Sequence, residues 1–362
     1  MIAAPPSSIL IVKPSSLGDV VHTLPAAAWL RQRFPGVRLG WLVNAELAPL
    51  VELCPLVTDV HRFERRRWGN PCRWGEFWAF LRGLRATGYA CAVDFQGLLR
   101  SGFMTWRSGA PRRIGFAAAR EGAAWFYSER LTPPPPAVHA VDKNLALVQL
   151  AFGALPADRP PPPAGPLLAP RPEQLAAAAA LWAGAGWPMA DSATGTAPPV
   201  LAVAPGARWP AKCWPPAFFA AVLDAVAQAR PDLRIWLLGT RDEQAAAAAV
   251  TAACRTARPL DCTGRTGLGE LLALLGRSAV LLTNDSGPMH LAAAAGVPTV
   301  ALFGPTDPDL TGPYGAGHTV LRGRCPQAPC FQRRCPHGVA SCHRGIEPAS
   351  AAAAILARLP AA

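Results

Sequence analysis

Residues 279–308, AVLLTNDSGPMHLAAAAGVPTVALFGPTDP, decide the fold that this sequence predicts. Two apolar runs, 279–282 and 297–303, have the length of buried strands, and a helix-like stretch from Pro288 separates them. A polar turn follows each run, TNDSG after the first and GPTDP after the second. This order predicts a βαβ unit of a parallel sheet whose carboxyl edge, where such sheets bind ligands, carries both turns.

The first of these turns contains a candidate ligand site. Asp285 and Ser286 stand where the helix begins, so the backbone N–H groups there suit a diphosphate. A simpler interpretation is that either side chain caps the helix. Capping does not account for Asp285, Ser286 and Gly287 together with His290 one helical turn later and a second polar loop. These four residues are therefore predicted to bind a ligand.

The N-terminal part of the chain repeats this arrangement. Residues 9–12 form a short apolar run, and the polar stretch 13–19, KPSSLGD, separates that run from a helix-like segment. Gly18 stands alone, so the loop has neither a dinucleotide-binding nor a P-loop fingerprint. Two such loops, one in each half of the chain, predict an α/β protein of two doubly wound, Rossmann-like domains that face each other across a cleft.

The length of the chain, 362 residues, suffices for two such domains. We expect an N-terminal domain over 1–157, with residues 1–8 disordered, and a proline-rich linker over 158–171. A C-terminal domain is expected over 172–348, followed by a helix over 349–362 that packs back on the N-terminal domain. Strands are expected at 9–12, 38–43, 90–94, 200–204, 233–238, 279–282 and 297–303, and helices at 19–33, 45–53, 74–87, 96–107, 142–153, 174–185, 215–229, 242–255 and 268–276.

Arginine gives the chain most of its formal net charge of +12, since lysine occurs only at positions 13, 143 and 212. Residues 61–130 hold thirteen arginines and five acidic residues, and residues 321–345 hold five arginines and no acidic residue. Such segments favour a polyanionic partner (nucleic acid, anionic lipid or a phosphorylated glycan), and each is also compatible with a solvated basic face. No apolar run reaches the roughly 18–20 residues of a membrane span, and the sequence opens without an export signal. We expect a cytoplasmic protein, in solution or on a membrane surface.

Ten cysteines in such a chain are expected to be reduced thiols. Four of them, Cys325, Cys330, Cys335 and Cys342, are close in sequence and have two histidines nearby. Their spacing matches neither paired CxxC motifs nor a zinc finger, which leaves packed thiols or a structural zinc open. No metal site is predicted.

Seven polar segments resemble the bacterial heptosyltransferases of lipopolysaccharide core synthesis, glycosyltransferase family 9. They are KPSSLGDVVHTLP (13–25), VDFQGLLRS (93–101), AREG (119–122), PGARWPAKCWP (205–215), LGTRDE (238–243), NDSGPMH (284–290) and FGPTDP (303–308). The resemblance extends from about residue 9 to residue 348. It implies a GT-B fold and the inverting, metal-independent transfer of L-glycero-D-manno-heptose from ADP-heptose to the Kdo/heptose inner core on lipid A, without a cofactor.

The resemblance also assigns roles to residues. Asp19 is carried over as the base that deprotonates the acceptor hydroxyl, and its position also suits a helix cap. Lys212 matches a lysine that contacts the donor phosphates. Glu243 is placed at the adenosine ribose. The chain departs from the family pattern at Ala207-Arg208, where some members carry hydroxyl residues, and Arg208 is expected to take over a phosphate contact there. The implied donor site consists of Lys212, Arg208, Glu243, Asp285, Ser286, Gly287 and His290.

The acceptor, a lipid A molecule carrying Kdo, is expected on the N-terminal half. Its implied contacts are Ser16, His22, Arg65, Arg66, Arg67, Gln96, Arg100 and Arg120, with the arginines at its carboxylates and phosphates. His22 either orients the acceptor or packs in the core. Arg120-Glu121, followed by an aromatic patch, favours the branch that adds the first heptose. The Asp-x-Asp triplet at 307–309 overlaps the matched GPTDP segment and is not expected to bind a metal.

The resemblance further implies a monomer on the anionic cytoplasmic face of the inner membrane, without a nucleic-acid partner. Two other classes stay open from the residues themselves. A nucleic-acid-binding protein would suit the net charge and the Trp-rich basic stretch at 65–74, although no such motif appears. A nucleotide-sugar epimerase of similar two-lobed form would not need the basic N-terminal half.

Overall fold

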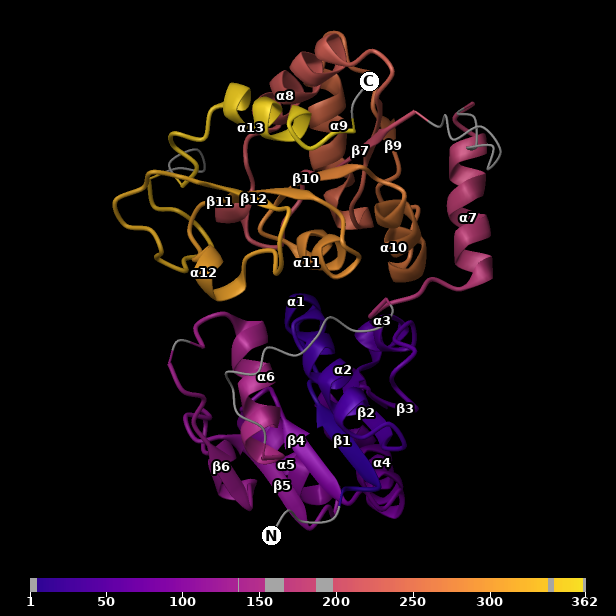
Figure 1. Cartoon of the computed structure of the whole chain (residues 1–362), viewed down its shortest axis with the longest axis vertical. Coiled ribbons are helices and arrows are strands. Elements are labelled where there is room, and N and C mark those ends of the chain that lie inside the picture. Colours follow the sequence, from indigo (N-terminus) through magenta and orange to yellow (C-terminus); the bar gives the residue numbers. More distant parts are fainter. Residues whose placement is uncertain (1–4, 136, 154–165, 187–197, 338–341, 361–362) are drawn as a thin grey trace. The chain divides into compact units, whose positions relative to one another are not determined.

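The computed structural model describes residues 5–135, 137–153, 166–186, 198–337 and 342–360. The chain forms two compact units, Met1–Ala169 and Pro170–Ala362, and each contains one six-stranded sheet (Figure 1). The predicted linker at 158–171 largely falls on residues outside the described ones, as does the predicted disorder at 1–4. In the N-terminal unit the chain is already ordered before residue 9, because Ser8 begins the first strand.

The N-terminal sheet is wholly parallel and has the strand order β3-β2-β1-β4-β5-β6. Its strands are β1 (Ser8–Val12), β2 (Arg38–Asn44), β3 (Asp59–Phe63), β4 (Cys91–Asp94), β5 (Arg112–Phe116) and β6 (Glu129–Leu131). The central strands β1 and β4 are buried along their whole length, as expected of a parallel sheet covered on both faces. The order reverses between β1 and β4, so the loops that follow these two strands flank the switch point at which such sheets bind ligands.

Helices and short 3₁₀ turns connect these strands. The helices are α1 (Leu17–Val21), α2 (Leu24–Arg33), α3 (Ala48–Val51), α4 (Trp74–Ala86), α5 (Leu99–Arg107) and α6 (Ala140–Ala151). The helix predicted at 19–33 is divided into α1 and α2 at His22-Thr23, just before Pro25, whose ring suits the first turn of a new helix. The division leaves α1 as a single short turn behind the polar loop at 13–16.

The C-terminal sheet has the same design, with the order β12-β11-β10-β7-β8-β9 and parallel pairing throughout. Its strands are β7 (Val200–Ala204), β8 (Arg234–Leu237), β9 (Leu260–Asp261), β10 (Val280–Asn284), β11 (Thr299–Phe303) and β12 (Thr319–Arg322). Here the order reverses between β7 and β10. The loops that follow these strands are 205–215 and 285–286, two of the segments singled out in the sequence.

The helices of this unit are α7 (Pro172–Ala183), α8 (Pro216–Ala229), α9 (Gln244–Ala253), α10 (Leu268–Gly276), α11 (Gly287–Ala294), α12 (Pro308–Thr311) and α13 (Pro348–Leu356). Helix α13 lies beside α8 (Figure 1), and its Ala351 and Ile355 join the buried core around Phe219. The apolar side of this helix is thus covered within its own unit. Among the described helices, none has both the length and the apolarity needed to cross a membrane.

The predicted α/β fold with two doubly wound, Rossmann-like units is confirmed. Five strands were missed: β3, β5, β6, β9 and β12. Four of them form the outer edges of the sheets, and they are short or only partly buried, so they lack the continuous apolar run that marks an inner strand.

Candidate functional site

The switch point of the C-terminal unit is occupied by a buried ion pair. Asp285 follows β10 with only 5% of its side chain exposed, and its Oδ2 lies 2.6 Å from Nζ of Lys212. The same oxygen accepts a hydrogen bond from Thr306 Oγ1 at 2.6 Å. Lys212 belongs to the loop after β7 and Thr306 to the loop after β11. Three strand-end loops therefore meet at one carboxylate, which fixes the position of the ammonium group.

Neither Asp285 nor Ser286 caps helix α11 through its side chain. Ser286 is the N-cap residue, but it forms no side-chain capping bond, and its hydroxyl instead lies 3.2 Å from Thr283 Oγ1. Ser286 thus holds the N-cap position without a side-chain bond to the helix, and the Asp285 carboxylate is bound to Lys212 and Thr306 instead. Gly287 begins α11, and His290 is buried one turn later. The first N–H groups of the helix and their positive partial charge lie at the same edge as Lys212.

The loop at 205–215 is held to β10 by a side chain that the sequence analysis did not single out. Asn284 is fully buried; its Nδ2 donates to Pro205 O at 2.7 Å, and its Oδ1 accepts from Trp214 N at 3.1 Å. The amide therefore bridges both ends of the loop, which fixes the short 3₁₀ turn at Pro210–Lys212. Lys212 thus precedes α8 by several residues and does not lie at its start.

Arg333 is a second cation near Lys212, and it was not among the site residues predicted from the sequence. Nζ of Lys212 lies 4.6 Å and Cζ of Arg333 lies 5.7 Å from the centre of the Trp209 ring. The Arg333 carbonyl accepts a hydrogen bond from Ala211 N at 3.1 Å, and Phe331 N donates to Pro305 O at 2.9 Å. The segment around Arg333 is therefore attached to two of the strand-end loops. The sequence showed the arginine excess at 321–345 but not which arginine reaches the site.

Glu243 lies at the ends of β7 and β8. Its Oε2 accepts from the backbone N of Thr240 at 2.7 Å and from the Thr240 hydroxyl at 3.1 Å. A Cβ atom at either Gly206 or Gly239 would clash with the Glu243 side chain, so these two glycines leave room for it. Arg208 is exposed and makes no ion pair with any described residue.

The switch point of the N-terminal unit carries a more open carboxylate. Asp19 lies in α1, and its Oδ2 accepts from the backbone N of Ser16 at 2.9 Å and from the Ser16 hydroxyl at 2.7 Å. Nζ of Lys13 lies 3.7 Å from Oδ1, and 42% of the Asp19 side chain is exposed. Ser16 is the N-cap residue of α1, and Asp19, at the third position of the helix, completes a capping box with it. Burial opposes ionisation of Asp19, but the Lys13 ammonium, the Ser16 hydrogen bonds and the charge of His22 outweigh it and lower its pKa.

The segment VDFQG (93–97), which includes the end of β4, forms hydrogen bonds with the loop that precedes α1. Lys13, which is almost fully buried, donates from Nζ to Phe95 O at 2.9 Å, and Ser15 N donates to Gln96 Oε1 at 3.3 Å. Asp94 in turn accepts from the backbone N of Gln96 at 2.8 Å and from the Tyr127 hydroxyl at 2.7 Å. The side chain of Gln96 thus contacts the loop that carries Asp19.

His22 is buried at the end of α1, and its ring lies 5.2 Å from that of His139 with the two planes at 71°. Asn144 of α6 donates to the His22 carbonyl at 3.1 Å and to Thr23 Oγ1 at 3.2 Å, while Thr23 Oγ1 donates to Asp19 O at 2.9 Å. Helix α6 therefore anchors the break between α1 and α2. Burial on this scale favours the packing interpretation of His22, although its charge still acts on Asp19.

The predicted acceptor arginines are not equivalent. Arg66 pairs with Glu46 at 3.1 Å, and Arg67 pairs with Glu76 at 2.6 Å. Arg65 and Arg100 instead line a hollow of about 640 Å³ together with aromatic side chains, and no described carboxylate forms an ion pair with either. Arg120 is exposed, and its backbone N donates to Gly97 O at 2.8 Å, next to Gln96. We name the hollow the aromatic hollow; it is lined by Phe63, Arg65, Trp68, Gly69, Trp74, Phe77, Trp78, Leu99, Arg100, Phe103, Glu121 and Phe126.

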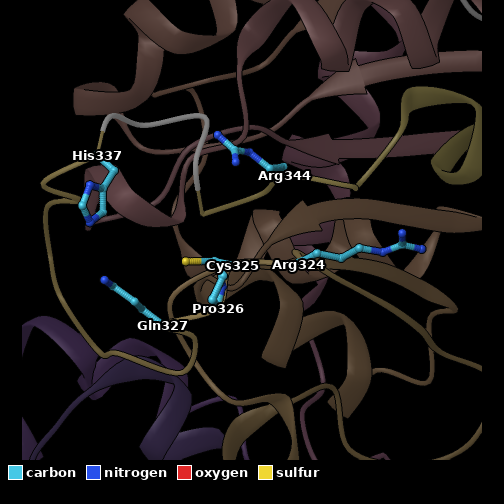
Figure 2. A pocket seen from close by; sticks show the side chains of 6 residues that line it. All are labelled: Arg324, Cys325, Pro326, Gln327, His337 and Arg344. Atoms are coloured by element: carbon cyan, nitrogen blue, oxygen red, sulfur yellow. The ribbon is translucent and has the colours of Figure 1, made fainter.

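One of the four clustered cysteines, Cys325, lines a second hollow, of about 330 Å³, in the C-terminal unit (Figure 2). Cys325, His337 and Arg344 contribute to its wall, and the Arg324 guanidinium extends away from the Cys325 thiol. Burial, followed by the neighbouring Cys335 thiol, raises the pKa of Cys342 to about 12. Over the described ranges no three His, Cys, Asp or Glu side chains are grouped so as to hold a metal ion.

The carboxylates of the Asp-x-Asp triplet are engaged within the protein. Asp307 caps α12 by accepting from Asp309 N at 3.0 Å, and Arg322 lies 3.6 Å from Asp307 and 2.6 Å from Asp309.

The two switch points supply different chemical groups. One offers an accessible carboxylate for proton transfer, and the other offers cations and backbone N–H groups for an anion.

Comparison with known proteins agrees with this chemistry. The sequence profile described as glycosyltransferase family 9 (heptosyltransferase) matches residues 77–340. Lipopolysaccharide heptosyltransferase 1 of Pseudomonas aeruginosa is 32% identical over 336 residues, which cover 91% of this chain and 87% of that protein.

Solved structures show the same architecture. The E. coli heptosyltransferase WaaC with ADP superposes with a TM-score of 0.70 at 26% identity, covering 87% of this chain and 93% of that one. The E. coli ADP-heptose lps heptosyltransferase II shares the fold with a TM-score of 0.74 at 23% identity, covering 97% and 98%. The chain is a glycosyltransferase, and it belongs to glycosyltransferase family 9, the heptosyltransferases.

Proposed function

We propose that this enzyme transfers L-glycero-D-manno-heptose from ADP-heptose to the Kdo-containing inner core of lipopolysaccharide, with inversion at the anomeric carbon. The observation that carries the proposal is the accessible Asp19 carboxylate at a sheet switch point, held by Ser16 and Lys13. The name of the Pseudomonas relative supports the acceptor class, and the WaaC structure with ADP supports the nucleotide of the donor. Family membership favours this reading over an epimerase or a nucleic-acid-binding protein.

In this proposal the C-terminal unit binds the donor. The diphosphate lies at the switch point, where Lys212 and the first N–H groups of α11 stabilise the charge that develops as ADP leaves. Asp285 already offsets the charge of Lys212 at 2.6 Å, so further positive charge is needed for a diphosphate. Arg333, on the same Trp209 ring, and Arg208 supply it. Glu243 is assigned to the adenosine ribose, and Ser286, Gly287 and His290 to the phosphate end.

The N-terminal unit binds the acceptor and carries the base. Asp19 accepts the proton of the attacking hydroxyl, the oxygen forms a bond to the anomeric carbon, and the bond to the ADP oxygen breaks on the opposite face, which inverts the configuration. The lowered pKa keeps Asp19 ionised before reaction. Gln96 and Ser16 shape the loop, and Arg65, Arg100 and Arg120 meet the acceptor's anionic groups. Arg66 and Arg67 act only through their charge at a distance, since each is paired.

We further propose that the transfer needs no metal ion or cofactor and that the enzyme works as a monomer on the anionic cytoplasmic face of the inner membrane. Arg322 occupies the carboxylates at 307–309, and cationic side chains are available for the diphosphate. Arg120-Glu121 and the name of the 32% identical relative support addition of the first heptose. Incubation with EDTA should leave the rate unchanged; a loss that zinc or magnesium restores would contradict the metal-free mechanism.

The purified chain tests the main proposal directly. With ADP-heptose and Kdo-lipid A it should release ADP and yield a heptosylated lipid, and NMR of the product should show the inverted anomer. Consumption of the donor without acceptor, or isomerisation of its sugar, would support the epimerase alternative. Retention of configuration would contradict the role given to Asp19.

A further inference from the structure

We infer that the aromatic hollow of the N-terminal unit binds one acyl chain of a phosphate-bearing lipid, with the phosphate held by Arg65 and Arg100. The inference rests on the proposed function, in that it assigns this lipid to the acceptor. The volume of the aromatic hollow, about 640 Å³, lies within the roughly 300–1,000 Å³ that is usual for small-molecule pockets.

The wall of the hollow is apolar and continuous. Trp68 contacts Phe63 and Phe77 with ring centres 5.5 Å and 5.6 Å apart, and Trp78 contacts Phe77 at 6.0 Å and Phe103 at 6.2 Å. Rings in these tilted arrangements support one another and keep the wall rigid. An aliphatic chain gains from contact with such a wall because apolar surface leaves water on both sides.

Three large apolar side chains of the wall are partly exposed to solvent, although burying them would be favourable. Trp74 is 54% exposed, Leu99 is 48% exposed and Trp78 is 40% exposed, and all three line the hollow. Arg107 stacks on Trp78 at 5.2 Å and on neighbouring Trp106 at 5.5 Å, which fixes these rings at the border. A contiguous exposed apolar surface with a charged rim is typical of a binding site.

The charge of the rim selects an anionic occupant. Arg100 lies over the Phe63 ring at 6.0 Å, and its pKa is lowered by burial and by the like charge of Arg65, against the opposing charge of Glu121. Two guanidinium groups close enough to repel each other, with one carboxylate nearby, leave excess positive charge beside an apolar wall. A phosphate relieves that repulsion, because a guanidinium donates paired hydrogen bonds to it. Neither a neutral lipid nor a small polar anion uses both features.

The test distinguishes the contribution of the acyl chain to binding from that of the phosphate. We would measure by calorimetry the binding of monomeric lysophosphatidic acid, monoacylglycerol and glycerol 3-phosphate in the absence of donor. Lysophosphatidic acid should bind about tenfold more tightly than either of the others. Trp74→Ala should weaken its binding about tenfold, whereas the matched control Trp125→Ala, at 79% exposure outside the hollow, should not. Leu99→Asp, also at an exposed position, should weaken it further by repelling the phosphate.

Transfer assays then place the lipid in the reaction. With Kdo-lipid A the KM should be lower than with its fully deacylated counterpart, and Trp74→Ala should remove the difference. Equal KM values in all variants, with lysophosphatidic acid binding unaffected by Trp74→Ala and Leu99→Asp, would overturn the inference while leaving the proposed function intact. A different result would point to contact with a bilayer. If monomeric lipid does not bind, and Trp74→Ala and Trp125→Ala weaken binding to vesicles of anionic phospholipid equally, the inference is overturned in favour of a bilayer contact. If neither acceptor is heptosylated but the binding differences hold, the proposed function fails and the lipid site stands.

Discussion

The two switch points of this enzyme use the same pair of residue types in opposite ways. In the N-terminal unit Lys13 is nearly buried and Asp19 is open, with 3.7 Å between Nζ and Oδ1. In the C-terminal unit Asp285 is buried and Lys212 is more exposed, at 17%, with 2.6 Å between Nζ and Oδ2. The exposed member of each pair is the one that meets substrate in our proposal, and the buried member positions it. The difference teaches that a lysine–aspartate pair can serve either a base or a cation, depending on which partner the fold leaves accessible.

The largest effect is expected where the exposed member takes part in proton transfer. Asp19→Asn should lower kcat by about 10²–10⁴, because the amide keeps the shape but cannot accept the proton. The affinity for ADP, measured by calorimetry, should be unchanged, since the donor is assigned to the other unit. Near-normal turnover by a mutant with an unchanged melting temperature would show that Asp19 is not the base.

Removing the exposed member of the second pair should affect the donor instead. Lys212→Ala should weaken ADP binding by on the order of 10–150-fold, which corresponds to the loss of a charge-assisted contact of about 1.5–3 kcal/mol. Lys143→Ala, at an exposed position in α6, is the matched control and should bind ADP as the wild type does. Unchanged ADP affinity in Lys212→Ala would remove this lysine from the donor site.

These two pairs also mark how far the sequence was predictive. The strand-end loops and their polar residues were recognised because inner parallel strands are continuous apolar runs, and the loops that follow them are polar. The partners of those residues were not. Lys13 meets Phe95, and Arg333 meets Trp209, across distances in sequence that only the packed sheet and its loops determine. The same holds for Asn284, whose amide joins two loops that no local pattern connects.

Charge was predicted in amount but not in distribution. The sequence placed Arg65, Arg66 and Arg67 together as acceptor contacts, whereas Glu46 and Glu76 pair with the second and third of them. An arginine excess predicts a polyanionic partner, but which guanidinium groups are available depends on tertiary neighbours. The neighbour of the C-terminal helix was unpredictable for a similar reason, since its alanines fit any apolar surface and only the fold shows that α8 packs on them.

The buried member of the first pair should change the pH dependence rather than abolish activity. Lys13 lowers the pKa of Asp19, so Lys13→Met should raise that pKa. Asp19 acts as a base only when ionised, and the acid limb of the kcat/KM profile should therefore move to higher pH, while the rate at alkaline pH falls less. Lys143→Met provides the control, and its profile should overlay that of the wild type. An acid limb that does not move would show that Lys13 acts on the loop structure and not through its charge.

Arg333 extends the comparison, because it adds to Lys212 a cation that has no counterpart carboxylate among the described residues. Arg333→Ala should weaken ADP binding about threefold to tenfold, less than Lys212→Ala, because an exposed guanidinium is screened by solvent. Its exposed neighbour Arg334 forms no ion pair or side-chain hydrogen bond with the described residues of the site, so Arg334→Ala should leave the affinity within twofold of the wild type. Equal effects of the two substitutions would indicate general attraction by the basic segment rather than a specific contact.

The smallest effect separates the arginines of the N-terminal unit. Arg65 is unpaired among the described residues and lines the aromatic hollow, whereas Arg67 is paired with Glu76 at 2.6 Å. Arg65→Ala should raise the acceptor KM a few-fold at low salt and flatten its rise with salt, since attraction between exposed charges fades as the Debye length falls from about 10 Å at 0.1 M to about 3 Å at 1 M. Arg67→Ala removes the same charge but leaves Glu76 with Arg73, 2.8 Å away, as its partner. Its acceptor KM should change less, and in both variants ADP affinity should stay constant. If Arg67→Ala has the larger effect, the acceptor is drawn by the net charge of the face and not by the guanidinium groups at the hollow. If either variant loses ADP affinity instead, the donor and acceptor have been assigned to the wrong units.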